Sequence, residues 1–366
     1  MNAERWILRA VRRALTVCAL VAGLAAGAAA QGFAGLGTEA EGFALPDPDR
    51  TLEFPRDHGA HPAFRIEWWY LTANLEGADG RQYGVQWTLF RSALAPGAKE
   101  GWTSPQVWIG HVGLTTPDAH FHGERMARGG IGQAGVALDP FRAWIDEWEM
   151  TAEGQGAPPE ADALDRLRLS ATTPRIGYDL TLRAEGPLVF HGRDGYSVKS
   201  EDGQASHYYS QPFYRAEGTL ALPGGDVGVT GRAWLDREWS SQPLSESQSG
   251  WDWISLHLED GAKLMAFRLR DRDGPPFLSG TWIAPDGTAT PMHGPDIAMT
   301  PRGTARVAGR TVPVAWRVEA PARDLDVTLR ARNPDAWMDL NFAYWEGPVA
   351  VSGTHTGAGY LEMTGY

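Results

Sequence analysis

The sequence has only one cysteine, Cys18, and it lies in an N-terminal segment that we expect to be removed from the mature protein. The mature chain therefore cannot form a disulfide, and its stability has to come from a packed core. Long apolar runs are missing as well, because no stretch after residue 30 is apolar enough to span a bilayer. We thus expect no transmembrane segment after processing.

Several catalytic motifs are also missing. The sequence has no Gly-x-Ser-x-Gly elbow, no His-Glu-x-x-His pair, no phosphate-binding Gly-x-x-x-x-Gly-Lys-Ser/Thr loop and no dinucleotide-binding unit. These absences argue against nucleotide binding, zinc-peptidase chemistry and ordinary serine-esterase chemistry. We expect no cofactor and no metal.

Basic residues are in deficit. There are 33 Lys and Arg against 45 Asp and Glu, which gives a formal net charge of −12. A chain with this balance is a poor candidate for binding nucleic acid or anionic lipid surfaces. Partners of those two classes are therefore not expected.

The N-terminus has the three parts of a secretory signal. Four arginines precede the apolar segment 14–24, and three alanines at 28–30 follow it. The segment changes to small residues too soon for a membrane anchor, so we predict cleavage before Gln31 and a periplasmic or secreted protein. Removal of residues 1–30 changes the net charge from −12 to −15. Arg12 and Arg13 leave the choice between the general and the twin-arginine export route open.

Glycine and proline are abundant and evenly spread, 44 and 25 residues respectively, as in chains with many short strands joined by turns. Apolar side chains alternate with polar ones over 83–89, 180–184 and 325–331, which predicts strands with one buried and one wetter face. Convincing helical patterns are scarce, and 167–171 fits a strand better than a helix. The sequence predicts an all-β protein.

A weak internal repeat suggests two copies of one β-unit. Residues 67–91 and 251–270 each resemble a hairpin with an acidic residue among tryptophans on the first strand and an arginine closing the second. About 336 mature residues also exceed what one core usually organises. We expect a lead-in at 31–50, an N-terminal domain at 51–224 and a C-terminal domain at 225–366, with the seam near Pro223-Gly224-Gly225.

Long aromatic motifs resemble those of a known family. They are His61-Pro62-Ala63-Phe64-Arg65-Ile66-Glu67-Trp68-Trp69-Tyr70, Tyr83 to Arg91, His191 to Ser197, Trp234 to Gln242, Gly250 to Trp253 and Tyr344 to Gly347. From about residue 51 to the end, the chain resembles the AttH-like exported proteins, which are related to the carotenoid 1,2-hydratases (hydroxyneurosporene synthases).

The resemblance implies two lipocalin-like antiparallel β-barrels packed together. Family members are often labelled secreted hydrolases, others stand beside ABC-transporter permeases, and related proteins hydrate or cyclise apolar polyenes. No catalytic position of the hydratases can be matched to this sequence residue by residue.

Four carboxylates beside tryptophans are the candidate catalytic groups: Asp236, Glu238, Asp252 and Glu67, in that order. In an extended strand Trp234, Asp236 and Glu238 share one face. A carboxyl group against indole surface loses hydration, so its pKa rises and it can donate a proton near neutral pH. The alternative is that these carboxylates form structural ion pairs with arginines: Arg65, Arg91, Arg237 or Arg268.

Tryptophan is frequent, with 16 residues, and most of these rings are expected to fill barrel cores. A subset with neighbouring His and Tyr is the candidate ligand-binding set: Trp69, Trp87, Trp108, His111, Tyr209, Trp239, Trp251, Trp253, Tyr344 and Trp345. The pair His120 and His122 lacks a third metal ligand nearby. His58 and His61, beside the Pro62 turn, are expected at the surface.

Three functions stay open. The first is an exported protein that binds a small apolar ligand, a lipid or isoprenoid, and serves an ABC-type transporter permease; the permease is suggested by the resemblance alone. The second is an enzyme, a hydratase-like lyase or a hydrolase, whose proton donor is a carboxyl group flanked by tryptophan. The third is carbohydrate binding on a flat row of exposed tryptophans.

Overall fold

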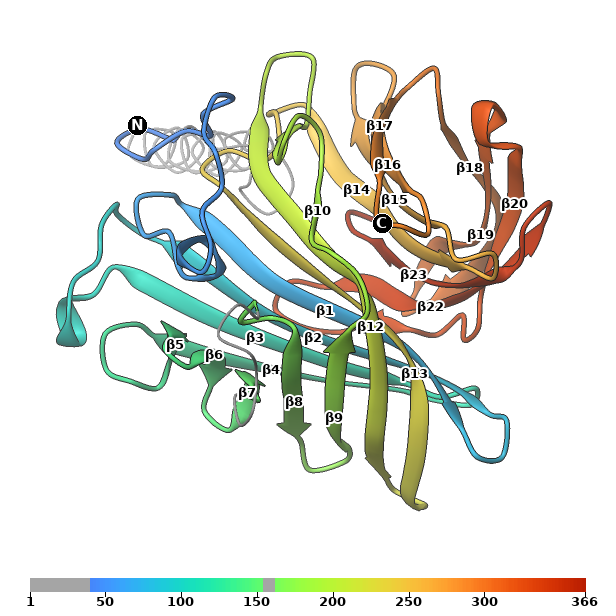
Figure 1. The fold of residues 1–366 in the computed structure, drawn as a ribbon, viewed down its shortest axis with the longest axis horizontal. Helices are drawn as coiled ribbons and strands as arrows, with labels where there is room; N and C mark the ends of the chain where they lie inside the picture. The colour runs from blue at the N-terminus through green and yellow to red at the C-terminus, as the bar shows by residue number, and fades with distance from the viewer. Residues whose placement is uncertain (1–39, 154–161) are drawn as a thin grey trace, which may run out of the picture.

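The computed structural model describes residues 40–153 and 162–366, and this part of the chain is built almost wholly from antiparallel strands. Its two sheets curl strongly, into a barrel and a half-barrel that pack against each other (Figure 1). Three short 3-10 helices complete it: η2 (Arg56–His58), η3 (Gly101–Thr103) and η4 (Pro321–Arg323). The all-β prediction is confirmed. The predicted signal at 1–30 lies outside the described residues.

The first sheet has thirteen strands and is coloured blue to yellow in Figure 1. Its order is β4 (His120–Arg128), β3 (Gln106–Thr115), β2 (Gln82–Ala93), β1 (Ile66–Gly77), β13 (Gly225–Ser240), β12 (Ala205–Leu222), β9 (Gly177–Ala184), β8 (Arg166–Thr172), β7 (Trp148–Ala152), β6 (Phe141–Ile145) and β5 (Ala134–Leu138), with β10 (Val189–Phe190) and β11 (Tyr196–Val198) paired to β12. Strand β6 folds back against β2, β3 and β4, which curls the sheet around its core.

The second sheet has ten strands, coloured orange to red. Its order is β17 (Ala289–His293), β16 (Phe277–Ile283), β15 (Lys263–Asp271), β14 (Gln248–Leu258), β23 (Gly357–Met363), β22 (Tyr344–Gly353), β20 (Leu325–Ala331), β19 (Arg310–Ala320) and β18 (Ala298–Val307), with β21 (Trp337–Met338) paired to β22. The two hairpins expected from the internal repeat are β1–β2 in the first sheet and β14–β15 in the second.

The chain passes from the first sheet to the second between Ser240 and Gln248. The turn Pro223-Gly224-Gly225, expected to be the seam, instead joins β12 to β13 as a hairpin. Strand β13 therefore stays with the first sheet, although the sequence division at 224 places it in the C-terminal half. It stays because it pairs with β1 on one side and β12 on the other, and a local turn pattern does not reveal such long-range pairing.

Three apolar clusters form the core. One fills the first sheet and one fills the second. The third lies between the sheets and contains aromatic side chains of both, including Tyr70, Tyr208, Trp253 and Phe267. Strand β2 is buried on both sides because β22 of the second sheet packs against it. Gln86 and Thr88 are 0% and 1% exposed, where the alternation predicted a wetter face.

None of the helices in the described residues is long and apolar enough to cross a membrane.

Candidate functional site

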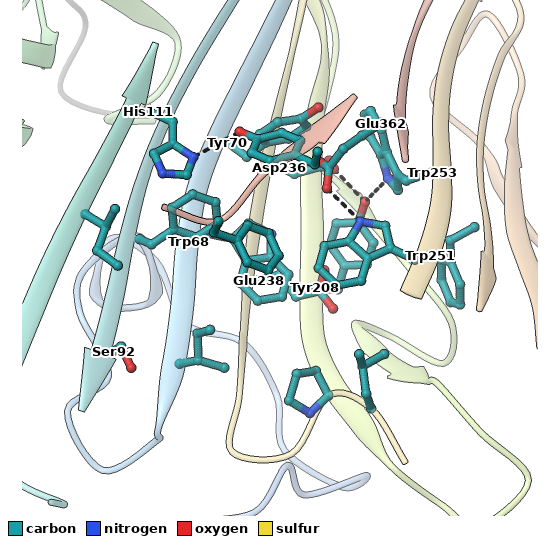
Figure 2. A pocket seen from close by; sticks show the side chains of 18 of the residues that line it. Trp68, Tyr70, Ser92, His111, Tyr208, Asp236, Glu238, Trp251, Trp253 and Glu362 are labelled. Atoms are coloured by element: carbon teal, nitrogen blue, oxygen red, sulfur yellow. Dashed lines mark hydrogen bonds between the residues drawn. The ribbon is translucent and has the colours of Figure 1, made fainter. Parts of the chain in front are cut away.

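A cavity of about 410 Å³ opens where the two sheets meet. Strands β1 to β4, β12 and β13 of the first sheet form one side, and β14, β15, β22 and β23 of the second form the other (Figure 2). Its mouth is marked by Met126, 55% exposed, and the exposed Asn341, whereas Asp236 and Tyr208 are buried at its inner end. The site thus lies at the interface between the two sheets, which is called the seam from here on. It does not lie inside the barrel or the half-barrel, because packed side chains fill both interiors.

The two-residue period of a strand decides which side chains reach the cavity. On β1, Trp68 and Tyr70 face the seam, whereas Trp69 points into the core of the first sheet. On β13, Asp236 and Glu238 line the cavity, and the predicted shared face is confirmed by the Trp234 indole N–H, which donates to Asp236 Oδ1 at 2.6 Å.

Asp236 is a buried carboxyl group held by three donors. The Tyr208 hydroxyl donates to Oδ2 at 2.6 Å, and the Ser210 hydroxyl joins the Trp234 indole at Oδ1. Burial raises the pKa of Asp236 from its ordinary 3.8 to about 7, although these hydrogen bonds oppose the rise. No ion pair to Asp236 is found among the described residues, so this carboxyl group can carry a proton near neutral pH.

Two hydrogen-bonded branches extend from Asp236. In one, the Trp253 indole N–H donates to the Tyr208 hydroxyl at 3.1 Å (Figure 2). In the other, the Ser210 Oγ lies 2.6 Å from His191 Nε2, whose Nδ1 lies 2.8 Å from Thr281 Oγ1 in the second sheet. Ser210, His191 and Asp236 do not make a hydrolytic triad, because the serine stands between the other two and does not line the cavity.

Glu238, two residues from Asp236, pairs with a lysine. Lys199 Nζ lies 2.8 Å from Glu238 Oε1, and both side chains are 7% exposed. The same ammonium sits 4.8 Å from the ring centre of Tyr208 and 4.1 Å from that of Phe267. The ammonium therefore lies over two aromatic rings of the cavity wall, and the charge of Glu238 contributes to the raised pKa of Asp236.

A second titratable carboxyl group faces the cavity from the other sheet. Glu362 accepts a hydrogen bond from the Trp251 indole at 2.6 Å, and Tyr70 bonds to it as well. Burial raises the pKa of Glu362 to about 7, assisted by the charges of Asp236 and Glu238. Directly opposite Glu362 in the β22–β23 ladder is Glu346, which is fully buried.

His111 lies on the cavity wall near the mouth. Its Nδ1 is 3.0 Å from the Tyr344 hydroxyl, and its Nε2 is 3.1 Å from Glu124 Oε1. Burial lowers the pKa of His111 below its ordinary value, and Glu124 opposes the shift. The imidazole is therefore neutral at pH 7 and has one donor and one acceptor nitrogen.

The other two candidate carboxylates point away from the cavity. Glu67 accepts from Arg91 and Arg237 inside the first sheet, and Asp252 pairs with Arg268 at 2.9 Å and with Arg270 in the second. These contacts correspond to the structural ion pairs that were the alternative at the sequence level.

The candidate ligand-binding residues divide in the same way. Four line the cavity: His111, Trp251, Trp253 and Tyr344. Six belong to the cores of the two sheets instead: Trp69, Trp87, Trp108, Tyr209, Trp239 and Trp345. Strand alternation separates the two groups, since a tryptophan next to a cavity residue in sequence points to the opposite face.

Two histidines expected at the surface are covered. His58 is fully buried and lies 2.7 Å from the Tyr209 hydroxyl, and His61 stacks on Trp239 with ring centres 4.0 Å apart. The segment that carries them folds over the end of the first sheet, a long-range contact that its turn-like sequence does not reveal. Among residues 40–153 and 162–366, no group of three or more His, Cys, Asp or Glu is arranged to hold a metal ion.

Several cavity residues were not among the sequence candidates: Trp68, Tyr70, Lys199, Tyr208 and Glu362. We predicted from the sequence that Tyr209 binds the ligand, but Tyr208, on the opposite face of β12, lines the cavity. The alternation itself carries a signal, because Tyr208 and Ser210 fall opposite Glu238 and Asp236 once β12 and β13 are paired. No local pattern marks Glu362 or Lys199.

Comparisons with known proteins agree with this architecture. A sequence model of the AttH-like family matches residues 45–366. Among solved structures, the chain is similar to a protein assigned as an AttH from Nitrosomonas europaea, with 33% identity, coverage of 88% of this chain and 99% of that one, and a TM-score of 0.78. No curated protein sequence matches the chain.

Two further structures share the fold at low identity. Kievitone hydratase from Nectria haematococca is 16% identical over 88% of this chain and 98% of its own, with a TM-score of 0.64. CghA, solved with Sch210972, is 12% identical over 89% of this chain and 97% of its own, with a TM-score of 0.53.

Proposed function

The chain belongs to the AttH-like family, and from the cavity in its seam we propose that it is an enzyme that adds water to a carbon–carbon double bond of a small apolar molecule. The observation that carries the proposal is Asp236, a carboxyl group with a pKa of about 7 at the inner end of an aromatic cavity. A protein named as a hydratase, kievitone hydratase, shares the fold.

The first step is proton donation. Asp236 gives its proton to one carbon of the double bond, whose π electrons form the new C–H bond and leave a cation at the other carbon. The hydroxyls of Tyr208 and Ser210 and the Trp234 indole all donate to the resulting carboxylate, so its charge is stabilised without rearrangement.

The second step is capture of the cation. The faces of aromatic rings stabilise positive charge, and Trp68, Trp251 and Trp253 all line the cavity. A water molecule adds through an oxygen lone pair and loses one proton to Glu362, whose pKa of about 7 leaves much of it ionised at neutral pH. The product is an alcohol, and no oxidant or reductant is needed.

A carrier of an apolar ligand is the second candidate, because the lining is mainly apolar and the volume suits one drug-sized molecule. A carrier does not need a protonated carboxyl group at the inner end of its site, so we rank it second. Of the tryptophans in the described part of the chain, only Trp102 is largely exposed, which disfavours a carbohydrate-binding row.

The test is to incubate the mature protein with a panel of isoprenoid alkenes in water enriched in heavy oxygen, and to search for hydrated products by mass spectrometry. We expect labelled alcohol from at least one alkene, and a loss of roughly 100-fold or more in rate for Asp236→Asn. Asp179→Asn, at an exposed carboxylate on β9, is the matched control and should leave the rate unchanged.

Equal rates for wild type and Asp236→Asn would contradict the proposed acid. A ligand that co-purifies in native mass spectrometry and is recovered unchanged would instead support the carrier.

A further inference from the structure

The cavity wall contains a second hydrogen-bonded system that the steps above do not use in full. We propose that a chain of side chains carries protons between Glu362 and solvent at the cavity mouth while a bound molecule fills the cavity. Its members, from the mouth inward, are Glu124, His111, Tyr344, Glu346, Tyr70 and Glu362. The inference rests on the proposed function for the purpose of this proton pathway, but the hydrogen-bonded side chains that form the pathway are present in the protein without a bound molecule.

The outer half of the chain begins near solvent. The Glu124 side chain is 15% exposed and contacts the exposed Asn341. Its Oε1 lies 3.1 Å from His111 Nε2, and the other ring nitrogen of His111 lies 3.0 Å from the Tyr344 hydroxyl. A neutral imidazole bonded at both nitrogens can accept a proton on one side and release one on the other.

The inner half is buried between the sheets. The Tyr70 hydroxyl donates to Glu346 Oε1, and Glu346 Oε2 has no hydrogen-bond partner among the described residues. The Tyr344 hydroxyl acts on Glu346, and the Tyr70 hydroxyl on Glu362, closely enough to lower the pKa of each carboxyl group. Glu346 and Glu362 are cross-strand partners, so two carboxyl groups and two phenols form one cluster, in which Glu346 is fully buried and Glu362 is partly exposed to the cavity. Burial, together with the charge of Glu362, raises the pKa of Glu346 well above its ordinary value, which keeps a proton in the cluster.

Occupancy of the cavity explains why such a chain is useful. An apolar molecule in the seam excludes water, so Glu362 cannot exchange its proton with solvent through the cavity. Five members of the chain line the cavity wall, and Glu346 lies behind them. The chain therefore runs past the bound molecule, and the proton that Glu362 takes from the attacking water can leave before the product does.

The experiment follows the proton on Glu346 without any substrate. In a Glu362→Gln protein, the carbonyl stretch of the protonated Glu346 carboxyl group is recorded by infrared spectroscopy after transfer to heavy water, and a double variant distinguishes it from the stretch of Asp236. The time course of its deuteration gives the exchange rate. If the band is absent from the double variant Glu346→Gln/Glu362→Gln, it is assigned to the Glu346 carboxyl group.

We expect Tyr344→Phe in this background to slow the exchange about tenfold or more, because the proton must then wait for local opening of the seam. His111→Gln, which keeps hydrogen-bonding atoms but does not relay a proton, should slow it similarly and serves if Tyr344→Phe does not fold. Tyr178→Phe is the matched control. The Tyr178 hydroxyl is equally buried, but it donates to the Gln86 carbonyl and is not a member of the proposed proton pathway.

The proposed proton pathway would be contradicted if the deuteration rate of Glu346 is unchanged in both Tyr344→Phe and His111→Gln. It would also be contradicted if no band can be assigned to Glu346. If the substitutions slow the deuteration of Glu346 as expected but the protein hydrates no alkene, only the proposed function is contradicted. The failure of the proton pathway and the failure of the proposed function can therefore be told apart.

Discussion

At the scale of single residues, the environment separates four similar carboxylates into two kinds. Glu67 and Asp252 each contact two arginines. Among the described residues, Asp236 has only neutral donors, and Glu362 is contacted by an indole and a phenol. All four lie beside tryptophan, so tryptophan does not distinguish them. Arg237 and Arg91 outweigh burial and hold the pKa of Glu67 well below its ordinary value, whereas burial raises the pKa of Asp252 although Arg270 and Arg268 oppose the rise. Asp236 and Glu362, which have no arginine partner in the described part of the chain, have pKa values of about 7.

Asp236 should make folding stability depend on pH. Its folded pKa of about 7 lies above its ordinary 3.8, so its contribution is fully present at low pH and is lost as pH rises toward 7. We expect Asp236→Asn to be more stable than wild type at pH 8, by up to about 4 kcal/mol, with a smaller difference at pH 4. Denaturant unfolding at both pH values measures this. A variant less stable than wild type at pH 8 would mean that the folded protein stabilises the charged form of Asp236 and would contradict the raised pKa.

At the scale of elements, the strand period assigns one function to each face. The inner face of β1 carries Glu67 into an ion cluster with Arg91 and Arg237, and its outer face carries Trp68 and Tyr70 to the cavity. The guanidinium of Arg237 also lies 3.7 Å from the ring centre of Trp69. The side chains on the inner face of β1 thus hold the strand in the first sheet, and those on the outer face line the cavity.

Glu67→Gln should destabilise the protein by about 3–5 kcal/mol at pH 7, because two buried guanidinium groups lose their counter-charge. Burial alone would raise the pKa of Glu67, but Arg237 and Arg91 hold it well below its ordinary value, so the carboxylate is charged at pH 7. Chemical denaturation gives the difference. Asp179→Asn, which breaks the exposed pair with Arg168, should change stability by less than about 1 kcal/mol. A small effect at Glu67 would show that the cluster is dispensable.

At the scale of the whole molecule, the site exists because two curled sheets meet. The third apolar cluster joins them, and its members Tyr208 and Trp253 also line the cavity and bond to each other. Gly84 on β2 lies against Pro348 on β22, and a Cβ at Gly84 would sit 2.6 Å from that ring. The separation of the sheets is therefore set by contact between small groups at the seam.

Gly84→Ala should force the sheets apart and destabilise the protein by about 1–3 kcal/mol. The same substitution at Gly228, on an exposed stretch of β13 where a Cβ has open space, should change stability by less than about 0.5 kcal/mol. Thermal and denaturant unfolding of the two variants gives the comparison. Equal effects at both positions would mean that the contact with Pro348 does not limit the approach of the sheets.

Much of the fold follows from local sequence. Alternation and evenly spaced turn residues predicted strands at 83–89, 180–184 and 325–331, and all three are found, in β2, β9 and β20. The hairpins at 67–91 and 251–270 and the shared face of Trp234 and Asp236 were also predictable, because each depends on residues close in the chain.

The tertiary structure alone decided where the site lies. A carboxylate beside tryptophan has the same local pattern at Asp236 and at Asp252, and only packing gives arginine partners to one and a cavity to the other. Glu362 carries no local signal, since its pKa depends on burial and on charges from the opposite sheet. The sequence by itself determined the strands and their faces, because these are short-range properties. The meeting of the two sheets determined the chemistry, because desolvation and charge pairing depend on residues that are far apart in the chain.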